Sequence, residues 1–253
     1  MLYFGTKFNY IKNILLKKDK FFIENVNKKL CFCVRILDRK HNNILLYGEL
    51  VQEQDYTKKY SARLTGNQFL YNEFKVMIRL VNAGLSRKEL TDKIINENLF
   101  EYRSLKSIGK HIGAVYERAN YLDEELAERI LTEPNEVGRL INFYAILKYD
   151  LLFLEFVEDV VAEKIYTHQT EISRADISNF FSIKAEQSEI VLNFKEATLK
   201  RLRLAYFELL LGAGYLVKNN DTMELNIPTS AYQISAYLES VGEKRFAKAM
   251  IGG

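Results

Sequence analysis

From residue 60 onward, apolar side chains recur every three or four positions, which is the spacing of helices that bury one face. Thr65 is expected to cap a first helix that ends at Gly84, and Ser86–Glu89 has the form of a capping box that opens a second. Ser104 is expected to cap a third helix that reaches about Ala119. The pattern therefore predicts three short helices in succession.

The most apolar part of the chain opens at Pro134 and runs to Ile165, after a shorter predicted helix from Asp123 to Leu131. Its most hydrophobic stretch, Leu140–Ala162, is interrupted by five charged residues. Each would be costly in a membrane, so a pair of buried helices with a break near Asp150 is expected.

Beyond this region the pattern alternates between helix and one short hairpin. The predicted elements are a helix from the capping box Ser173–Asp176, a longer helix from about Phe194 to Ala213 closed by Gly214, strands Tyr215–Lys218 and Met223–Ile227, and a helix from Ser230 to about Met250. The sequence thus predicts a mainly α multi-helix bundle with a small β-hairpin.

Three parts of the chain are distinguished. Residues 1–59 form an N-terminal extension with a possible hairpin, Leu30–Leu37 and Ile44–Val51, although a partly ordered leader fits equally well. Residues 60–166 are expected to form a helical subdomain with a helix-turn-helix-like unit, and residues 167–253 a second one with a winged-helix-like hairpin.

Composition and charge exclude several classes of function but do not identify one. The net charge of +3 is ordinary for a surface of mixed sign, and Cys31 and Cys33 suit neither a disulfide with each other nor a complete zinc site, which favours a reduced cytoplasmic setting. No signal peptide, phosphate-binding loop or hydrolase motif is found, and the three histidines lie far apart. A carboxylate-rich run at residues 155–163 is expected to be solvated or salt-bridged. We expect no enzyme activity, cofactor, metal or small-molecule substrate.

Two basic helices are candidate surfaces for double-stranded DNA, because cations neutralise phosphates and small residues let a helix approach the groove. On the third helix the face opposite the apolar stripe carries Lys106, Ser107, Lys110, Gly113 and Ala114, with Arg103 at the entry and His111 and Arg118 at the flank. On the long helix and the following hairpin the candidates are Lys195, Thr198, Lys200, Arg201 and Lys218, in the order of a winged helix. The alternatives are a solvated face for the first helix and a buried helix with a structural hairpin for the second.

Several short elements resemble the BrxA family of BREX phage-defence systems over about residues 60–230. They are Tyr60-Ser-Ala-Arg-Leu-Thr-Gly66, Asn96–Leu99, Arg103-Ser104, Lys110–Arg118, Asp123–Leu126, Thr198–Arg201 and Leu210–Leu216. The resemblance implies a helical, non-catalytic protein with affinity for DNA. The chain is also similar to families likened to the antitermination factor NusB, which leaves RNA or protein binding open. A second hypothesis for the function is an interaction protein that docks onto larger defence enzymes through an apolar groove around Phe207 and Leu211.

Overall fold

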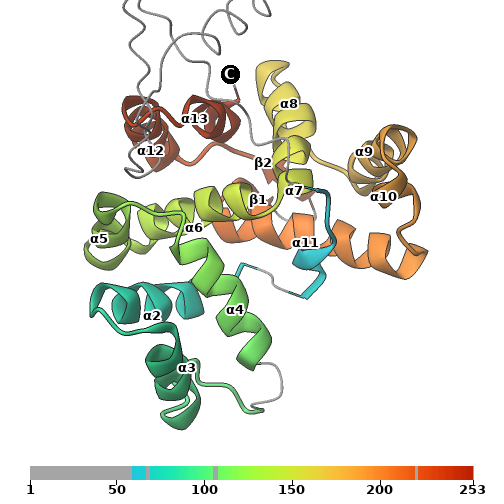
Figure 1. Ribbon diagram of the computed structural model, residues 1–253. Helices are drawn as coiled ribbons and strands as arrows, with labels where there is room; N and C mark the ends of the chain where they lie inside the picture. Colours follow the sequence, from blue (N-terminus) through green and yellow to red (C-terminus); the bar gives the residue numbers. More distant parts are fainter. Residues whose placement is uncertain (1–58, 67–68, 105–107, 220–221, 253) are drawn as a thin grey trace, which may run out of the picture. The chain divides into compact units, whose positions relative to one another are not determined.

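The computed structural model describes residues 59–66, 69–104, 108–219 and 222–252, which belong to one compact unit (Figure 1). The fold is mainly α-helical with one two-stranded sheet, as the sequence predicts. The predicted hairpin at residues 30–51 lies outside the described residues. Among those that are described, no helix combines the length and the apolar character that a membrane span requires.

The first part of the unit is a run of short helices. They are the 3-10 helix η1 (Arg63–Gly66) and the α-helices α2 (Tyr71–Asn82), α3 (Arg87–Asn96), α4 (Ile108–Ala119) and α5 (Glu124–Thr132). The predicted capping box of α3 is confirmed, because the Ser86 amide donates to the Glu89 carboxylate at 2.8 Å and the Ser86 hydroxyl accepts from the Glu89 amide at 3.4 Å. Asp123 caps α5 by accepting from the Leu126 amide at 2.9 Å.

The predicted cap at Thr65 is wrong. The Thr65 hydroxyl donates to the Ala62 carbonyl at 2.8 Å within the turn of η1, and α2 begins only at Tyr71. Leu70 stands before it in the left-handed region, at a φ of 47°. A threonine that satisfies its hydroxyl within its own turn favours that turn over the start of a longer helix.

The apolar centre of the chain forms the core of the unit. It contains α6 (Asn135–Tyr149), α7 (Leu151–Phe156), the π-helical turn η3 (Val157–Val161) and α8 (Ala162–Tyr166). Helix α6 is buried along nearly its whole length and packs on α4, α5, α11, α12 and α13. The predicted break is confirmed, since the Asp150 carboxylate accepts from the Phe153 amide at 2.9 Å and caps α7.

The C-terminal part follows the predicted order with two differences. Its elements are α9 (Arg174–Gln187), α10 (Glu189–Leu192), α11 (Glu196–Ala213), β1 (Leu216–Asn219), β2 (Thr222–Leu225), α12 (Thr229–Ser240) and α13 (Lys244–Ile251). Gly214 closes α11 at a φ of 85°, as expected. The short α10 is not predicted from the sequence, and the single final helix is instead two helices that turn at Gly242, whose φ is 87°.

Candidate nucleic-acid interface

Helix α4 buries the predicted apolar stripe and leaves a narrow face open to solvent. Ile108, Ile112 and Val115 are buried where the helix packs on α2 and α6. Lys110 is exposed on the other side, with Gly109 and Gly113 beside it. Lys106 and Ser107, which the sequence places at the start of this face, lie outside the described residues.

The two glycines of this face have no packing role in the described structure. A Cβ built on Gly109 or on Gly113 would meet no atom within 4 Å. Glycine within a helix costs about 0.5–1 kcal/mol relative to alanine, because it loses more backbone freedom on folding. The two glycines therefore leave the backbone of α4 accessible to a bulky partner at a cost in stability.

The structure moves two of the predicted surface residues inward. Ala114 and Arg118 are buried, although the helical spacing assigns the first to the open face and the second to its flank. The Arg118 guanidinium donates to the Phe69 carbonyl at 3.3 Å and lies over the Tyr149 ring, 5.1 Å from its centroid. Burial lowers the pKa of Arg118 to about 10. Arg118 is thus a structural residue that anchors the segment before α2.

The N-terminal turns of α11 form the second basic cluster. Lys195, Lys200 and Arg201 are exposed, and Thr198 is half-buried. Farther along, Tyr206 and Leu210 are buried in the core, and the exposed charged residue is the acidic Glu208.

Leu204, Phe207 and Leu211 form a second apolar face of α11, and they differ in burial. Leu204 is 50% exposed, whereas Phe207 and Leu211 are partly buried and pack against the core. The exposed Leu204 therefore lies on the part of α11 that also carries the exposed cations. Phe207 and Leu211 pack against the core and help to hold α11 in place.

The hairpin after α11 carries an exposed Lys218 in β1, opposite Met223 in β2. A third segment adds to this small sheet. Glu171 forms an isolated antiparallel bridge with Glu224, and the Leu225 amide donates to the Thr170 carbonyl at 2.6 Å. The segment between α8 and α9 therefore pairs with the outer strand of the hairpin.

The two basic helix ends are separate. In Figure 1 the N-terminal end of α11 lies at the right and that of α4 at the bottom, with η1 between the two helices. Helix η1 packs against α11, and its last residue, Gly66, contacts the side chains of Lys110 and His111 on α4. The described residues thus provide two basic patches joined through η1.

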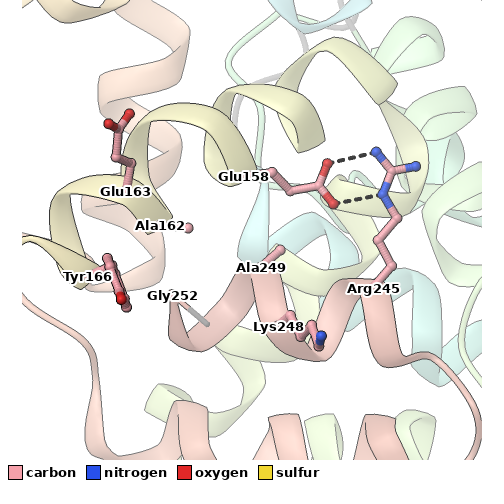
Figure 2. Close-up of a pocket in the computed structure, with 8 residues that line it drawn as sticks. All are labelled: Glu158, Ala162, Glu163, Tyr166, Arg245, Lys248, Ala249 and Gly252. Atoms are coloured by element: carbon pink, nitrogen blue, oxygen red, sulfur yellow. Dashed lines mark hydrogen bonds and ion pairs between the residues drawn. The ribbon is translucent and has the colours of Figure 1, made fainter.

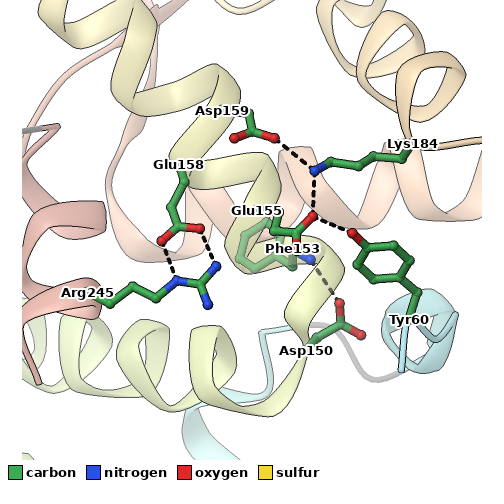
Figure 3. A network of polar contacts seen from close by, with 8 residues as sticks. All are labelled: Tyr60, Asp150, Phe153, Glu155, Glu158, Asp159, Lys184 and Arg245. Atoms are coloured by element: carbon green, nitrogen blue, oxygen red, sulfur yellow. Dashed lines mark hydrogen bonds and ion pairs between the residues drawn. The ribbon is translucent and has the colours of Figure 1, made fainter. Parts of the chain in front are cut away.

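The carboxylates of α7 and η3 are salt-bridged, as the sequence suggests (Figure 3). The Lys184 ammonium lies 2.5 Å from Glu155 and 3.0 Å from Asp159, and the Arg245 guanidinium makes two contacts of 2.7 Å with Glu158. Within the described parts of the chain, no three metal-ligating side chains converge.

A hollow of about 340 Å³ lies between the η3–α8 segment and α13 (Figure 2). Ala162, Ala249 and Gly252 form much of its wall, and the Arg245–Glu158 pair closes one end. It contains none of the predicted DNA-binding residues, although Glu158 and Glu163 belong to the carboxylate-rich run. Arg245 and Glu158 are paired with each other at that end, and Glu163, Tyr166 and Lys248 supply the other polar groups of the lining.

Comparisons with known proteins agree with one another. A model of the BrxA family matches residues 58–242 of the chain. A protein of Bacillus cereus named BREX protein BrxA is 29% identical over 203 residues, which are 80% of this chain and 100% of that protein. A second protein of that name, from Paramagnetospirillum magneticum, is 18% identical over 186 residues, which are 74% of this chain and 93% of the relative.

A solved structure has the same fold. It is the crystal structure of an uncharacterized protein from Magnetospirillum magneticum, with a TM-score of 0.67 at 16% identity, and the match covers 78% of this chain and 100% of that one. At this identity the likeness extends to the fold alone.

Proposed function

The chain belongs to the BrxA family, and from this premise we propose that it is a non-catalytic component of a BREX phage-defence system that binds double-stranded DNA, mainly through the phosphate backbone. Two relatives that match along most of their length are named BREX protein BrxA, which supports the defence role. The partners we propose are double-stranded DNA and other BREX proteins, and the proposed location is the cytoplasm.

One observation carries the DNA-binding proposal. Six of the predicted DNA-binding residues are described cations that are exposed and form no ion pair with a described carboxylate. They are Arg103, Lys110, Lys195, Lys200, Arg201 and Lys218. Several other cations, such as Lys148 and Lys184, are instead neutralised by carboxylates. Exposed cations without a carboxylate partner are available to replace the counterions of a phosphate backbone.

The arrangement around the hairpin supports a winged-helix interpretation of the C-terminal part. A winged helix places a short strand before its second helix, and that strand pairs with the wing. The bridge from Glu171 to Glu224 occupies this place, followed by α9, α11 and the hairpin. In such a domain the helix before the wing enters the major groove, and the wing contacts backbone. Lys200 and Arg201 would then lie in or beside the groove, and Lys218 near a phosphate.

The test is the binding of purified protein to a labelled random-sequence duplex, followed by fluorescence anisotropy over a series of salt concentrations. We expect the logarithm of the binding constant to fall linearly with the logarithm of salt concentration, with a slope of about −0.9 for each phosphate contacted. Absence of binding at low salt contradicts the proposal.

Charge reversals identify the contacting helix. Lys110→Glu tests α4, and Lys200→Glu and Arg201→Glu, each made singly, test α11. Lys244→Glu on α13 makes the same charge change at an exposed site outside both patches. We expect the α4 and α11 variants to bind all sequences more weakly and with a shallower salt slope, because phosphate contacts carry no sequence information. Lys244→Glu should behave as the wild type does; an equal loss there would indicate a general effect of net charge.

The second candidate function is that of a subunit that binds other proteins. Helices α9 and α10 expose apolar side chains, with Ile183 at 45% and Leu192 at 66%. A complex with another BREX protein that forms without DNA and survives high salt would support this role, because apolar burial is far less sensitive to salt than counterion release.

A further inference from the structure

Helix η1 contacts both of the basic helices. On α4, the Arg63 guanidinium donates to Glu117 at 2.9 Å, and Nε2 of His111 is 3.1 Å from the carbonyl oxygen of Gly66. A Cβ built on Gly66 would collide with Nζ of Lys110, so this ammonium lies directly against the end of η1. Helix η1 also packs against α11. One short element therefore connects the two basic patches.

The segment that carries η1 is anchored in the core. Within η1, the side chain of Leu64 is fully buried. Beyond η1, the Phe69 carbonyl accepts hydrogen bonds from Arg118 at 3.3 Å and from Asn142 at 2.6 Å, and both of these side chains are fully buried. Because buried and hydrogen-bonded groups hold the segment at both places, the fold fixes the separation of the patches.

The covalent chain limits how far apart the patches lie. The Phe69 ring packs on Gly212 of α11, since a Cβ built there would lie 2.5 Å from the ring. The chain from Gly66 to Phe69 spans at most about 11 Å, and the rise of an α-helix puts Lys200 about 18 Å from Gly212. The Lys110 ammonium and the Cα atom of Lys200 therefore lie within about 40 Å of each other, and one turn of B-DNA is about 35 Å long.

The basic ends of both helices point out of the unit. Figure 1 shows η1 between α4 and α11, and the N-terminal end of each helix points away from α6. The exposed cations Lys110, Lys200 and Arg201 lie within the first two turns of their helices. A helix N-terminus carries a partial positive charge, so the helix ends and these side chains attract the same anionic partner.

The neighbouring carboxylates define the extent of this surface. Glu117 of α4 is paired with Arg63, and Glu196 at the start of α11 is paired with Arg203. The exposed Glu208 lies farther along α11, about 10 Å beyond Arg201. A carboxylate repels phosphates, so the part of α11 that suits DNA ends before Glu208.

We propose that the α4 and α11 patches form one DNA-binding surface, on which a single duplex contacts Lys110 and Lys200 at the same time over about one helical turn. Helix η1 fixes the spacing of the two patches. This inference rests on the DNA-binding function proposed above and adds that one duplex occupies both patches. Two independent duplex sites, or one patch that binds alone, would contradict it.

The number of duplexes that each chain binds is the first measurement. The full chain is mixed with an excess of a labelled duplex of about 12 base pairs, which is little more than one turn, and followed by sedimentation velocity. At concentrations well above Kd we expect one duplex for each chain. Two duplexes for each chain would overturn the shared surface.

Neutral substitutions show whether both patches contact that duplex. Lys110→Gln and Lys200→Gln each remove one phosphate contact, and a salt slope of about 0.9 for each contact makes each loss about eightfold at about 0.1 M salt. On a shared surface the losses multiply, so the double variant should bind about sixtyfold more weakly than the wild type. Lys244→Gln, outside both patches, should bind as the wild type does.

The pattern of losses separates the possible outcomes. Single variants that bind nearly as the wild type does, while the double variant does not, would show two independent sites. One single variant without any loss would show that only the other patch binds. Lys110→Arg and Lys200→Arg keep the charge and should retain most of the affinity; an equal loss in them would show that phosphate attraction is not the cause. Absence of binding by the wild type at low salt would instead overturn the DNA-binding function itself.

Discussion

Buried charges are the residues whose roles the sequence conceals most completely. Arg118 lies on the border of the helical stripe of α4, and spacing alone places it at the flank of an open face. The structure buries it completely, beneath the segment that leads into α2. The spacing of apolar residues predicts which side of a helix is buried. Whether a residue at the edge of that side is buried depends on how elements distant in the sequence pack against it.

Asp150 gives a prediction at the same scale. Its buried carboxylate accepts hydrogen bonds from the Phe153 amide and from the Ser61 hydroxyl at 3.2 Å, and burial raises its pKa to about 6. A raised pKa means that the folded state holds the proton more tightly than the unfolded state. The stability from this group is therefore fully present below about pH 4 and is lost as the pH rises through about 6.

Asp150→Asn tests this linkage. Asparagine does not ionise and still serves as a helix N-cap, so we expect the variant to fold. Its free energy of unfolding in urea, relative to that of the wild type, should improve as the pH rises from about 4 to about 7. A difference that stays constant with pH would mean that the carboxylate titrates alike in both states.

At the scale of elements, residues 60–66, which carry the first motif that resembles the family, connect η1 to α7 and to the core. The Tyr60 hydroxyl donates to Glu155 at 2.6 Å, the Ser61 hydroxyl donates to Asp150, and Leu64 is buried in the core. The first contact joins this segment to α7, the second to the N-cap residue of α7, and the third to the core. The motif residues are therefore explained by packing without any ligand.

The open face of α4 makes the second prediction. Because a Cβ at Gly109 or Gly113 meets open space, Gly109→Ala and Gly113→Ala should each stabilise the protein by about 0.5–1 kcal/mol in urea unfolding. If DNA approaches the backbone of α4 closely, the same substitutions should weaken duplex binding. Increased stability with unchanged binding would count against α4 as a contact surface.

Gly214→Ala is the control for that experiment. Gly214 closes α11 at a φ of 85°, a conformation that side chains with a Cβ rarely adopt. The same substitution should here lower the free energy of unfolding by about 1 kcal/mol. Opposite signs at the two kinds of position would show that backbone conformation and local space, and not alanine itself, set the effect.

At the scale of the whole molecule, α6 is shared by both halves of the described unit. It packs on α4 and α5 before it in the sequence and on α11, α12 and α13 after it. The boundary between subdomains 60–166 and 167–253 stays a prediction, but the two share one core.

Expression of residues 60–166 alone tests how far the two subdomains depend on each other. We expect this fragment to expose the apolar side of α6 and to lack a cooperative unfolding transition, because burial of that side provides much of the folding free energy. A fragment that unfolds cooperatively would establish an independent N-terminal subdomain.

The sequence by itself determined the fold class, most helix boundaries and the hairpin, because capping residues, glycines and apolar spacing act over a few neighbouring positions. Ser86, Asp123, Ser173 and Gly214 all stand where local chemistry predicts. It also placed Lys110, Lys200, Arg201 and Lys218 on exposed positions.

Only the tertiary structure decided what depends on elements far apart in the chain. Four features depend on segments that are distant in the sequence. They are the late start of α2, the burial of Ala114 and Arg118, the strand contact at Glu171, and the hydrogen bonds of His111 with Tyr102 and Gly66. Local propensity carries no information about such pairs, because their free energy arises from packing and desolvation after the chain has closed on itself.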